Sequence, residues 1–346
     1  MLFSLIFLLG VAASEKNTID HERIRQSVRQ AITFLKNHQQ KNGAIILDGN
    51  DWFNVWETVN ATLAIATWQN PKDSLKDPII QAALIFLKDS ETLDGMVLHY
   101  SDHNNSYCVE ASSEYVRLLS LLEKRNTVSY MEVLPKAIFL IKKQLNSGPW
   151  KIINNYVSED LQLFPSVTGF VLRALAAAEM SPLYPDQALG YLKDSQNEEG
   201  HWGIDWQYYG TPYYAMDPIL KILQLYNKEG LYDKAISKAR DYLFSRQRKD
   251  GSFLHAPEKY GSGPSAELQT VLALKSLLSC NIGVDHVRVQ KGIRWLLGRQ
   301  RKNGSWNGGM FPVPDPRIRR KEDVYCTAQA LTLFHKYIGL LDQKQG

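Results

Sequence analysis

Cysteine is scarce in this chain of 346 residues, which holds three cysteines and no Cys-x-x-Cys pair. Cys108, Cys280 and Cys326 lie too far apart to provide a disulfide framework or a finger-type zinc site. The sequence also lacks the patterns His-Glu-x-x-His and Gly-x-Ser-x-Gly, and it has no glycine-rich phosphate loop. We therefore expect a fold held together by side-chain packing, without a metal ion or another cofactor.

Charge of one sign is not concentrated in any part of the chain. Its 40 Lys and Arg residues and 36 Asp and Glu residues give a formal net charge of +4. Because these charges are scattered, the basic stripe typical of nucleic-acid binding is missing, and we expect no nucleic-acid partner. A short basic run at residues 317–321 follows prolines and indicates a solvated loop, with contact to an anionic ligand group as the alternative.

Long apolar runs are also missing, apart from the first thirteen residues, MLFSLIFLLGVAA. This run is shorter than the ~18 residues that a membrane-spanning helix needs, and no later segment reaches that length. Val11 and Ala13 suit a signal-peptide cleavage site, so we expect a leader over residues 1–13 and a secreted or exported protein. The alternatives are an anchor in peripheral contact with a membrane, and a buried first helix.

One twelve-residue phrase recurs six times along the chain. It reads FLKNHQQKNGAI, FLKDSETLDGMV, FLIKKQLNSGPW, YLKDSQNEEGHW, YLFSRQRKDGSF and WLLGRQRKNGSW. The phrase follows the pattern aromatic-Leu-x3-Gln-x3-Gly-x-aromatic, and its successive glycines lie 51 to 53 residues apart. So even a spacing indicates one supersecondary unit used six times.

Each unit has the pattern of a helical hairpin. Apolar residues at helical spacing precede the phrase, and its glycine suits a left-handed C-terminal cap. A second helix, small and apolar on most sides, is predicted after a variable loop, at residues 56–68, 109–122, 166–179, 215–226, 265–278 and 323–337. Such helices suit an inner ring, while the charged first helices suit an outer ring. The sequence predicts an all-α fold, an (α/α)6 toroid, as one domain over residues 14–346.

The repeated glutamines and aromatics are interpreted as scaffold residues. A glutamine at a helix end can bond to exposed peptide groups there, and the aromatic two residues after the glycine can lie against the neighbouring hairpin. Residues repeated in every unit belong more often to the repeated scaffold than to one ligand site. We therefore assign them to holding one repeat against the next.

The phrase resembles the QW repeat of the terpenoid cyclase and protein prenyltransferase superfamily, over nearly all of the chain after the leader. The segments GHWGIDWQYYGTPYYAMDP and GSGPSAELQTVLALKSLL also resemble squalene-hopene-type cyclases. The resemblance implies a toroid whose inner helices enclose an apolar pocket for an isoprenoid chain. Its length suits a single-domain class II terpene cyclase.

The sequence departs from this superfamily at two motifs. Class II cyclases carry an Asp-x-Asp-Asp motif, and the matching stretch at residues 214–217 keeps only Asp217, with Met216 where the proton-donating aspartate is expected. Prenyltransferases bind zinc through an aspartate, a cysteine two residues on and a histidine in the following repeat. Asp323 and Cys326 stand in the last repeat, which no further repeat follows, so a zinc prenyltransferase is disfavoured.

Acid-initiated cyclisation requires a carboxyl group kept protonated and aromatic faces that stabilise a carbocation. The candidate acids are Glu110, Asp217 and Asp323, each of which has the alternative of a favourable interaction with a helix dipole. Aromatic residues gather in the loops and first turns of the inner helices, where they would line a substrate pocket; packing in the core is the alternative for any one of them. The candidates are Trp52, Trp56, Tyr107, Phe164, Tyr208, Tyr213, Tyr214 and Tyr260.

Three functions are compatible with this sequence. The first is a class II terpene cyclase that acts on a linear isoprenoid or prenylated small molecule, with no obligate protein partner. The second is a non-catalytic toroid that binds isoprenoids or other lipids, and the third is a secreted carbohydrate-active (α/α)6 enzyme. A closed apolar cavity with a buried carboxyl would favour the cyclase, an open cleft would favour the glycan enzyme, and a filled centre would argue against both enzymes.

Overall fold

A computed structural model describes residues 19, 21–47, 53–70, 73, 76–93, 95–97, 107–124, 128–152, 163–204, 210–255, 263–309 and 322–345. The proposed leader at residues 1–13 lies outside this part of the chain. Twelve α-helices make up the part described, which confirms the all-α prediction. None of the helices described there is both long and apolar enough to cross a bilayer.

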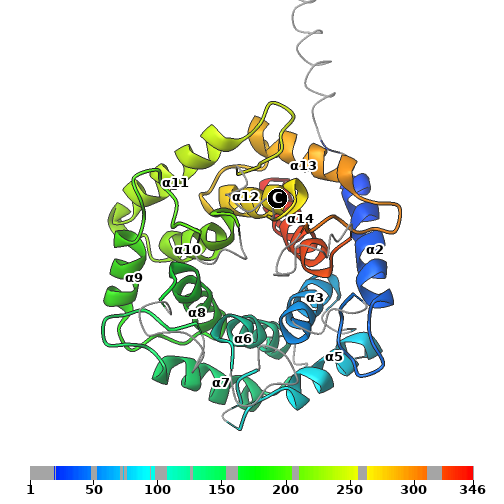
Figure 1. Cartoon of the computed structure of the whole chain (residues 1–346), viewed down its shortest axis with the longest axis vertical. Helices are drawn as coiled ribbons and strands as arrows, with labels where there is room; N and C mark the ends of the chain where they lie inside the picture. The colour runs from blue at the N-terminus through cyan, green and yellow to red at the C-terminus, as the bar shows by residue number, and fades with distance from the viewer. Residues whose placement is uncertain are drawn as a thin grey trace, which may run out of the picture.

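The helices form two concentric rings (Figure 1). The outer ring consists of α2 (His21–Asn37), α5 (Pro78–Asp89), α7 (Tyr130–Lys142), α9 (Pro185–Asp194), α11 (Asp233–Arg246) and α13 (Val287–Arg299). The inner ring consists of α3 (Asn54–Trp68), α6 (Val109–Glu123), α8 (Pro165–Ala177), α10 (Tyr213–Leu225), α12 (Ala266–Ser279) and α14 (Val324–Gln345). Each inner helix packs against the next, and α14 packs against α3, so the ring closes. The predicted (α/α)6 toroid is confirmed.

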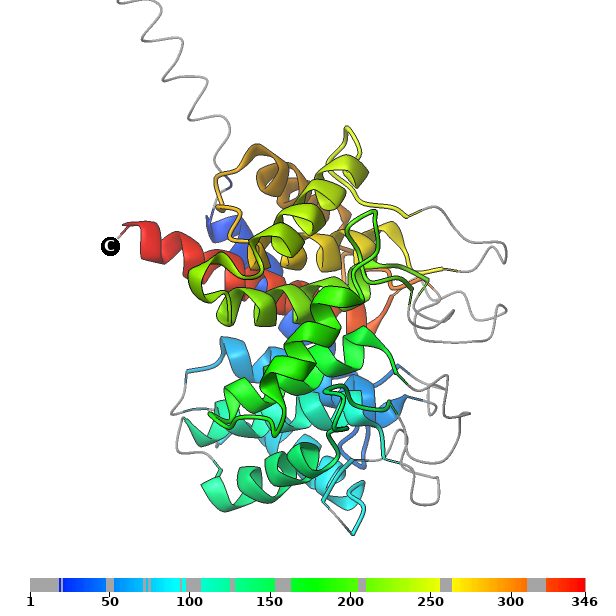
Figure 2. The same ribbon diagram turned by 90° about the vertical axis from the view of Figure 1, so that its left-hand side faces the viewer.

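The two rings differ in burial as their sequences require. Helix α12 is buried on all sides, from Glu267 to Ser279, because it touches two inner neighbours and two outer helices. Helix α2 instead buries one stripe, which includes Ile24, Val28 and Leu35, and leaves its charged face in water. The end of α14 extends beyond the rings on one side of the molecule (Figure 2).

The repeated glutamine and glycine join each outer helix to the next one. Gln300 Nε2 donates to the carbonyl of Gly304 at 2.9 Å and to that of Ser27 on α2 at 2.9 Å, so the last repeat is bound to the first. Gly304 has a φ of +92°, and a Cβ there would lie 2.3 Å from the carbonyl oxygen of Gln30. Glycine is therefore required both for the turn and for the close approach. The same pair of hydrogen bonds is made by Gln39, Gln144, Gln196 and Gln247.

The closing tryptophans bond within their own repeat. The indole N–H groups of Trp150, Trp202 and Trp306 donate to the carbonyls of Leu140, Leu192 and Leu296, ten residues earlier in the preceding outer helix. These carbonyls are among those that a helix C-terminus leaves without an intrahelical partner. The tryptophans thus cap their own outer helices, while the glutamine and glycine make the contact between repeats.

The second repeat replaces the glutamine by Glu91 and joins its neighbour in another way. Glu91 accepts a hydrogen bond from the Tyr115 hydroxyl at 3.0 Å and forms a 3.0 Å ion pair with Lys136 on α7. Both side chains of this ion pair are largely shielded from water. An ion pair to the next outer helix therefore stands where the other repeats use glutamine.

Candidate functional site

Glu110 lies in the first turn of α6 and is 1% exposed. The Ser166 hydroxyl on α8 donates to its Oε1 at 3.1 Å, and the Tyr214 hydroxyl on α10 donates to its Oε2 at 3.2 Å. Helices α6 and α10 both flank α8, and all three residues lie in the first turns of their helices. The Glu110 carboxyl therefore lies where the N-terminal ends of three consecutive inner helices meet.

Aromatic side chains accompany Glu110 in the same part of the inner ring. The rings of Phe170 and Tyr214 lie 5.4 Å apart, and those of Trp56 and Tyr325, from α3 and α14, lie 4.0 Å apart. Burial, together with the negative charges of Glu114 and Glu110, raises the pKa of Tyr325 well above its usual value. The Glu110 charge therefore contributes to the raised pKa of Tyr325, so the two side chains lie in the same region.

Asp217 lies deeper along the inner ring and takes part in an ion network. Its carboxylate pairs with Arg173 at 3.1 Å and with Lys275 at 3.4 Å, and it accepts a 2.9 Å hydrogen bond from Ser279. Burial alone would raise the pKa of Asp217, but the positive charges of Lys275, Lys336 and Arg173 outweigh it and hold the pKa far below its usual value. An ionised carboxylate of this kind does not suit the predicted role of proton donor.

Asp323 directly precedes α14 and caps that helix. Its Oδ1 accepts a 2.6 Å hydrogen bond from the backbone N–H of Cys326, and its backbone carbonyl accepts bonds from Thr327. This is the N-cap arrangement, which satisfies a backbone donor at the start of a helix. These bonds agree with the alternative to the acid role, in which Asp323 interacts favourably with the start of its helix.

The predicted aromatic residues do not all face the interior. Tyr214 bonds to Glu110 and Trp56 packs against Tyr325 of the neighbouring inner helix, but Tyr213 packs against Tyr242 and Phe253 on the outer side of α10. Tyr107 packs edge-on against Phe139 of α7. Phe164 is half-buried immediately before α8, while Trp52, Tyr208 and Tyr260 lie outside the described residues.

A cavity of about 250 Å³ opens between the later turns of the inner helices. It takes side chains from all six of them. The residues that line it are Asn60, Leu63, Thr67, Glu114, Arg117, Arg173, Asp217, Lys221, Lys275, Gln329, Thr332, His335 and Lys336. Twelve of these thirteen side chains are polar and five of them are lysine or arginine, in contrast to the apolar tunnel that a prenyl chain would need.

The charges around this cavity are only partly paired. Glu114 pairs with Arg117 and with Arg173, and Arg173 also pairs with Asp217. Lys221 is exposed to water, but partial desolvation of its ammonium group and the neighbouring guanidinium groups of Arg117 and Arg173 lower its pKa to about 7. Burial likewise lowers the pKa of Lys275 to about 8, against the favourable charge of Asp217. Excess positive charge thus accumulates in this cavity.

Four positions in the sequence signal this cluster, although they are neither acidic nor aromatic. Arg117, Arg173, Lys221 and Lys275 each interrupt the apolar stretch of an inner helix, at corresponding positions in four consecutive hairpins. A charged residue in a helix buried on most sides must be paired or must face a polar cavity. Ser166 and Phe170, which lie beside Glu110 and Tyr214, carried no comparable signal.

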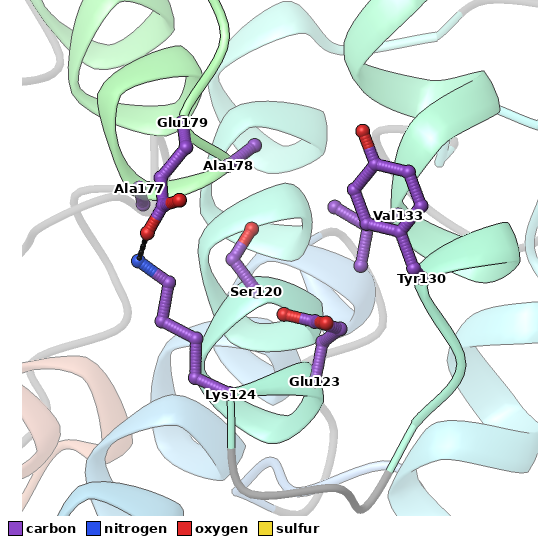
Figure 3. A pocket seen from close by; sticks show the side chains of 8 residues that line it. All are labelled: Ser120, Glu123, Lys124, Tyr130, Val133, Ala177, Ala178 and Glu179. Atoms are coloured by element: carbon purple, nitrogen blue, oxygen red, sulfur yellow. Dashed lines mark hydrogen bonds and ion pairs between the residues drawn. The ribbon is translucent and has the colours of Figure 1, made fainter.

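A second hollow lies at the ends of α6 and α8 and the start of α7. It measures about 490 Å³, and its lining includes Ser120, Glu123, Tyr130 and an ion pair between Lys124 and Glu179 at 2.7 Å (Figure 3). Both charged partners are largely exposed, with 48% and 76% of their side chains accessible. None of the candidate acids or aromatics lines this hollow.

A family model for the squalene-hopene cyclase C-terminal domain matches residues 160–315. Squalene–hopene cyclase from Bradyrhizobium diazoefficiens is 31% identical over 143 residues, which are 38% of this chain and 20% of that protein. The matched region thus spans about a fifth of this relative's length. The resemblance to the terpenoid cyclase superfamily, predicted from the repeated phrase, is confirmed.

Solved structures with the same architecture carry different activities. A complex of the type II terpene cyclase MstE from Scytonema with its substrate, geranylgeranyl dihydroxybenzoate, superposes with a TM-score of 0.71 at 15% identity, over 92% of this chain and 98% of that one. A glycosidase variant superposes with a TM-score of 0.59 at 12% identity, over 93% of this chain and all of that one. At these identities the likeness shows the fold, and the site must decide the function.

Proposed function

We propose that the chain is a class II terpene cyclase-like enzyme in which Glu110 donates the initiating proton. The observation that carries this proposal is the buried Glu110 carboxyl, held by two hydroxyl groups and accompanied by aromatic rings. The neighbour MstE binds a prenylated substrate, which supports a linear isoprenoid or prenylated molecule as substrate here. Of the three candidate acids, Glu110 is the one whose carboxyl accepts hydrogen bonds from two neutral hydroxyl groups, whereas Asp217 pairs with basic side chains and Asp323 caps a helix.

The described residues suit the protonation and cation-stabilising steps of such a reaction. Glu110 would transfer its carboxyl proton to an alkene or epoxide of the substrate, leaving a carboxylate on Glu110 and a carbocation on the substrate. The Ser166 and Tyr214 hydroxyls, which already donate to Glu110, would stabilise that carboxylate. The rings of Trp56 and Phe170 would stabilise the cation through their π faces during ring closure. A final proton loss to a base would release the cyclised product with unchanged mass.

The test compares Glu110→Gln with the wild type and with Glu198→Gln, the same change at an exposed position on the surface. Geranylgeraniol, squalene, their epoxides and prenylated aromatic acids are incubated with purified protein, and cyclised products are sought by chromatography and mass spectrometry. Glu110→Gln should lower turnover by ~10² or more, as expected for loss of a positioned general acid, with substrate binding nearly intact.

Two results would contradict the proposal. Cyclisation that survives Glu110→Gln would remove Glu110 from its role as acid. Prenyl chains that bind without any product would favour the non-catalytic isoprenoid-binding toroid. Cleavage of a glycan by the protein would instead favour the carbohydrate-active alternative, whose architecture the glycosidase shares.

Export through the leader at residues 1–13 is a separate proposal. It is supported by the apolar run and by the small residues at its end. N-terminal sequencing of protein recovered from the culture medium should begin at residue 14. Protein retained in cells with residues 1–13 intact would contradict export.

A further inference from the structure

We propose that the basic cavity of the inner ring binds a small polyanion of the phosphate class, either phosphate or diphosphate. The cavity belongs to a different part of the toroid from Glu110. Arg117 follows Glu110 by seven residues in α6, about 10 Å along the helix axis at 1.5 Å per residue. This site therefore goes beyond the proposed cyclase and does not depend on it.

The charge of the cavity is the first argument. Its lining carries five basic side chains and two carboxylates, which leaves an excess of three positive charges when all five basic groups are protonated and His335 is neutral. The basic residues are Arg117, Arg173, Lys221, Lys275 and Lys336, and the acidic residues are Glu114 and Asp217. These side chains come from α6, α8, α10, α12 and α14, so five helices of a closed ring direct charge to one place. A bound anion with two or three negative charges would balance this excess.

The second argument is that donors remain available after the internal ion pairs are made. Among the described residues, Lys221 makes no hydrogen bond and no ion pair, although it lines the cavity. The Nε of Arg173 is buried and meets no acceptor in the part of the chain described, although both Nη atoms are paired. A buried donor left without an acceptor costs free energy, and an oxyanion would remove that cost.

Burial of the cluster is the third argument. The exposed fraction of the side chains rises from 3% at Glu114 and 7% at Arg173 to 29% at Lys336, and Lys221 is exposed, so the cavity runs from the interior to water. At about 250 Å³ it is smaller than the roughly 300–1,000 Å³ of sites for drug-sized ligands. Guanidinium forks and ammonium groups are the donors that proteins use for phosphate oxygens. Size and chemistry together favour a compact phosphate group.

The proposal is tested by isothermal titration of the full chain at constant ionic strength, with inorganic phosphate, diphosphate and citrate as separate probes. Phosphate or diphosphate should bind at one site per chain, and Lys221→Gln should weaken binding about tenfold or more, because one charge-assisted contact is lost. The control is Lys234→Gln, which makes the same change in net charge at an exposed lysine of α11. This variant should bind phosphate and diphosphate with the affinity of the wild type. Melting curves without ligand should show that Lys221→Gln remains folded, because this side chain has no partner to lose.

Anion affinity measured over a range of pH gives a second test. If Lys221 had only a structural role, its protonation would not change this affinity. Sulfate serves as the probe because its charge does not change between pH 6 and 9. The pKa of Lys221 is lowered to about 7, so sulfate affinity should fall as the pH rises above 7, by a total of about the tenfold expected for Lys221→Gln, and more weakly in Lys221→Gln itself. The charged and titratable groups of the other elements around this lysine are Glu114, Arg117, Arg173, Lys275, His335 and Lys336, with Asp217 on its own helix. Since Lys275 has a pKa of about 8, a smaller pH dependence should persist in the variant.

Three results would overturn the proposal. The first is no binding of phosphate or diphosphate at millimolar concentration, which would leave the cluster as an internal ion network. The second is equal affinity in the wild type and in Lys221→Gln, which would place the anion elsewhere. The third is binding of citrate without binding of phosphate or diphosphate, which would make the ligand a carboxylate.

Discussion

Gly304 closes the toroid, and replacing it with alanine should destabilise the protein more than the same change at Gly203. Both glycines have left-handed backbones, with φ of +92° and +83°. A Cβ at position 304 would lie 2.3 Å from the carbonyl oxygen and 2.5 Å from the carbonyl carbon of Gln30 on α2. A Cβ at position 203 meets no atom of the described residues within 4 Å. The pair therefore separates backbone strain from the contact that closes the ring.

The expected magnitudes follow from these distances. The left-handed conformation costs an alanine about 1–2 kcal/mol at either position. At position 304 the Cβ would overlap with backbone atoms of α2. This overlap can be relieved only if α2 and the turn after α13 move apart. Overpacking of this kind costs about 1–3 kcal/mol, and losing the bond from Gln300 to the Ser27 carbonyl costs about 1 kcal/mol more. We expect a loss of ~3–6 kcal/mol for Gly304→Ala against ~1–2 kcal/mol for Gly203→Ala.

Urea denaturation, followed by circular dichroism and tryptophan fluorescence, measures both free energies of unfolding. The two probes should give coincident transitions if the closed ring unfolds as one unit. Equal destabilisation by the two substitutions would refute the reasoning, because it would mean that the contact between the sixth and first repeats contributes nothing. A biphasic transition in Gly304→Ala alone would instead indicate a ring that opens at this seam before it unfolds.

The remaining predictions concern the ion network and the repeated tryptophans. Asp217→Asn should lower the free energy of unfolding by ~3–5 kcal/mol, measured by urea denaturation, because it leaves Arg173 and Lys275 buried without their counter-charge; a change under ~1 kcal/mol would contradict this. Because the folded-state pKa of Asp217 is depressed, its contribution is present above pH ~4 and is lost as pH falls further, so the wild type and Asp217→Asn should converge in acid. Trp306→Ala should cost roughly 3 kcal/mol through lost packing and the lost bond to Leu296, with ligand binding unaltered; unaltered melting with lost binding would move Trp306 from the scaffold to the site.

Much of the fold could be predicted from local pattern. The repeated phrase places a glycine after each outer helix, and the small apolar segments predicted at residues 56–68 and 109–122 correspond to α3 and α6. Helix formation, burial of one face and termination at glycine depend on neighbours a few residues away, which the sequence states directly. The role of the closing tryptophans was only partly predicted, because capping their own helix and packing on the next hairpin are both compatible with the same spacing.

The candidate site was decided by tertiary structure. The sequence did not distinguish three carboxyl groups as candidate acids. In the closed ring, Asp217 has three basic neighbours, whereas Glu110 accepts a hydrogen bond from the hydroxyl of Tyr214, 104 residues away. Which side chains meet across the interior depends on the radius of the ring and the rotation of each inner helix. Both are set by packing summed over six hairpins rather than by any one of them. The repeat therefore determined that a toroid forms. The closed ring determined that the Glu110 carboxyl lies beside aromatic rings in one part of the inner ring, and that basic groups in excess of the carboxylates gather in another part.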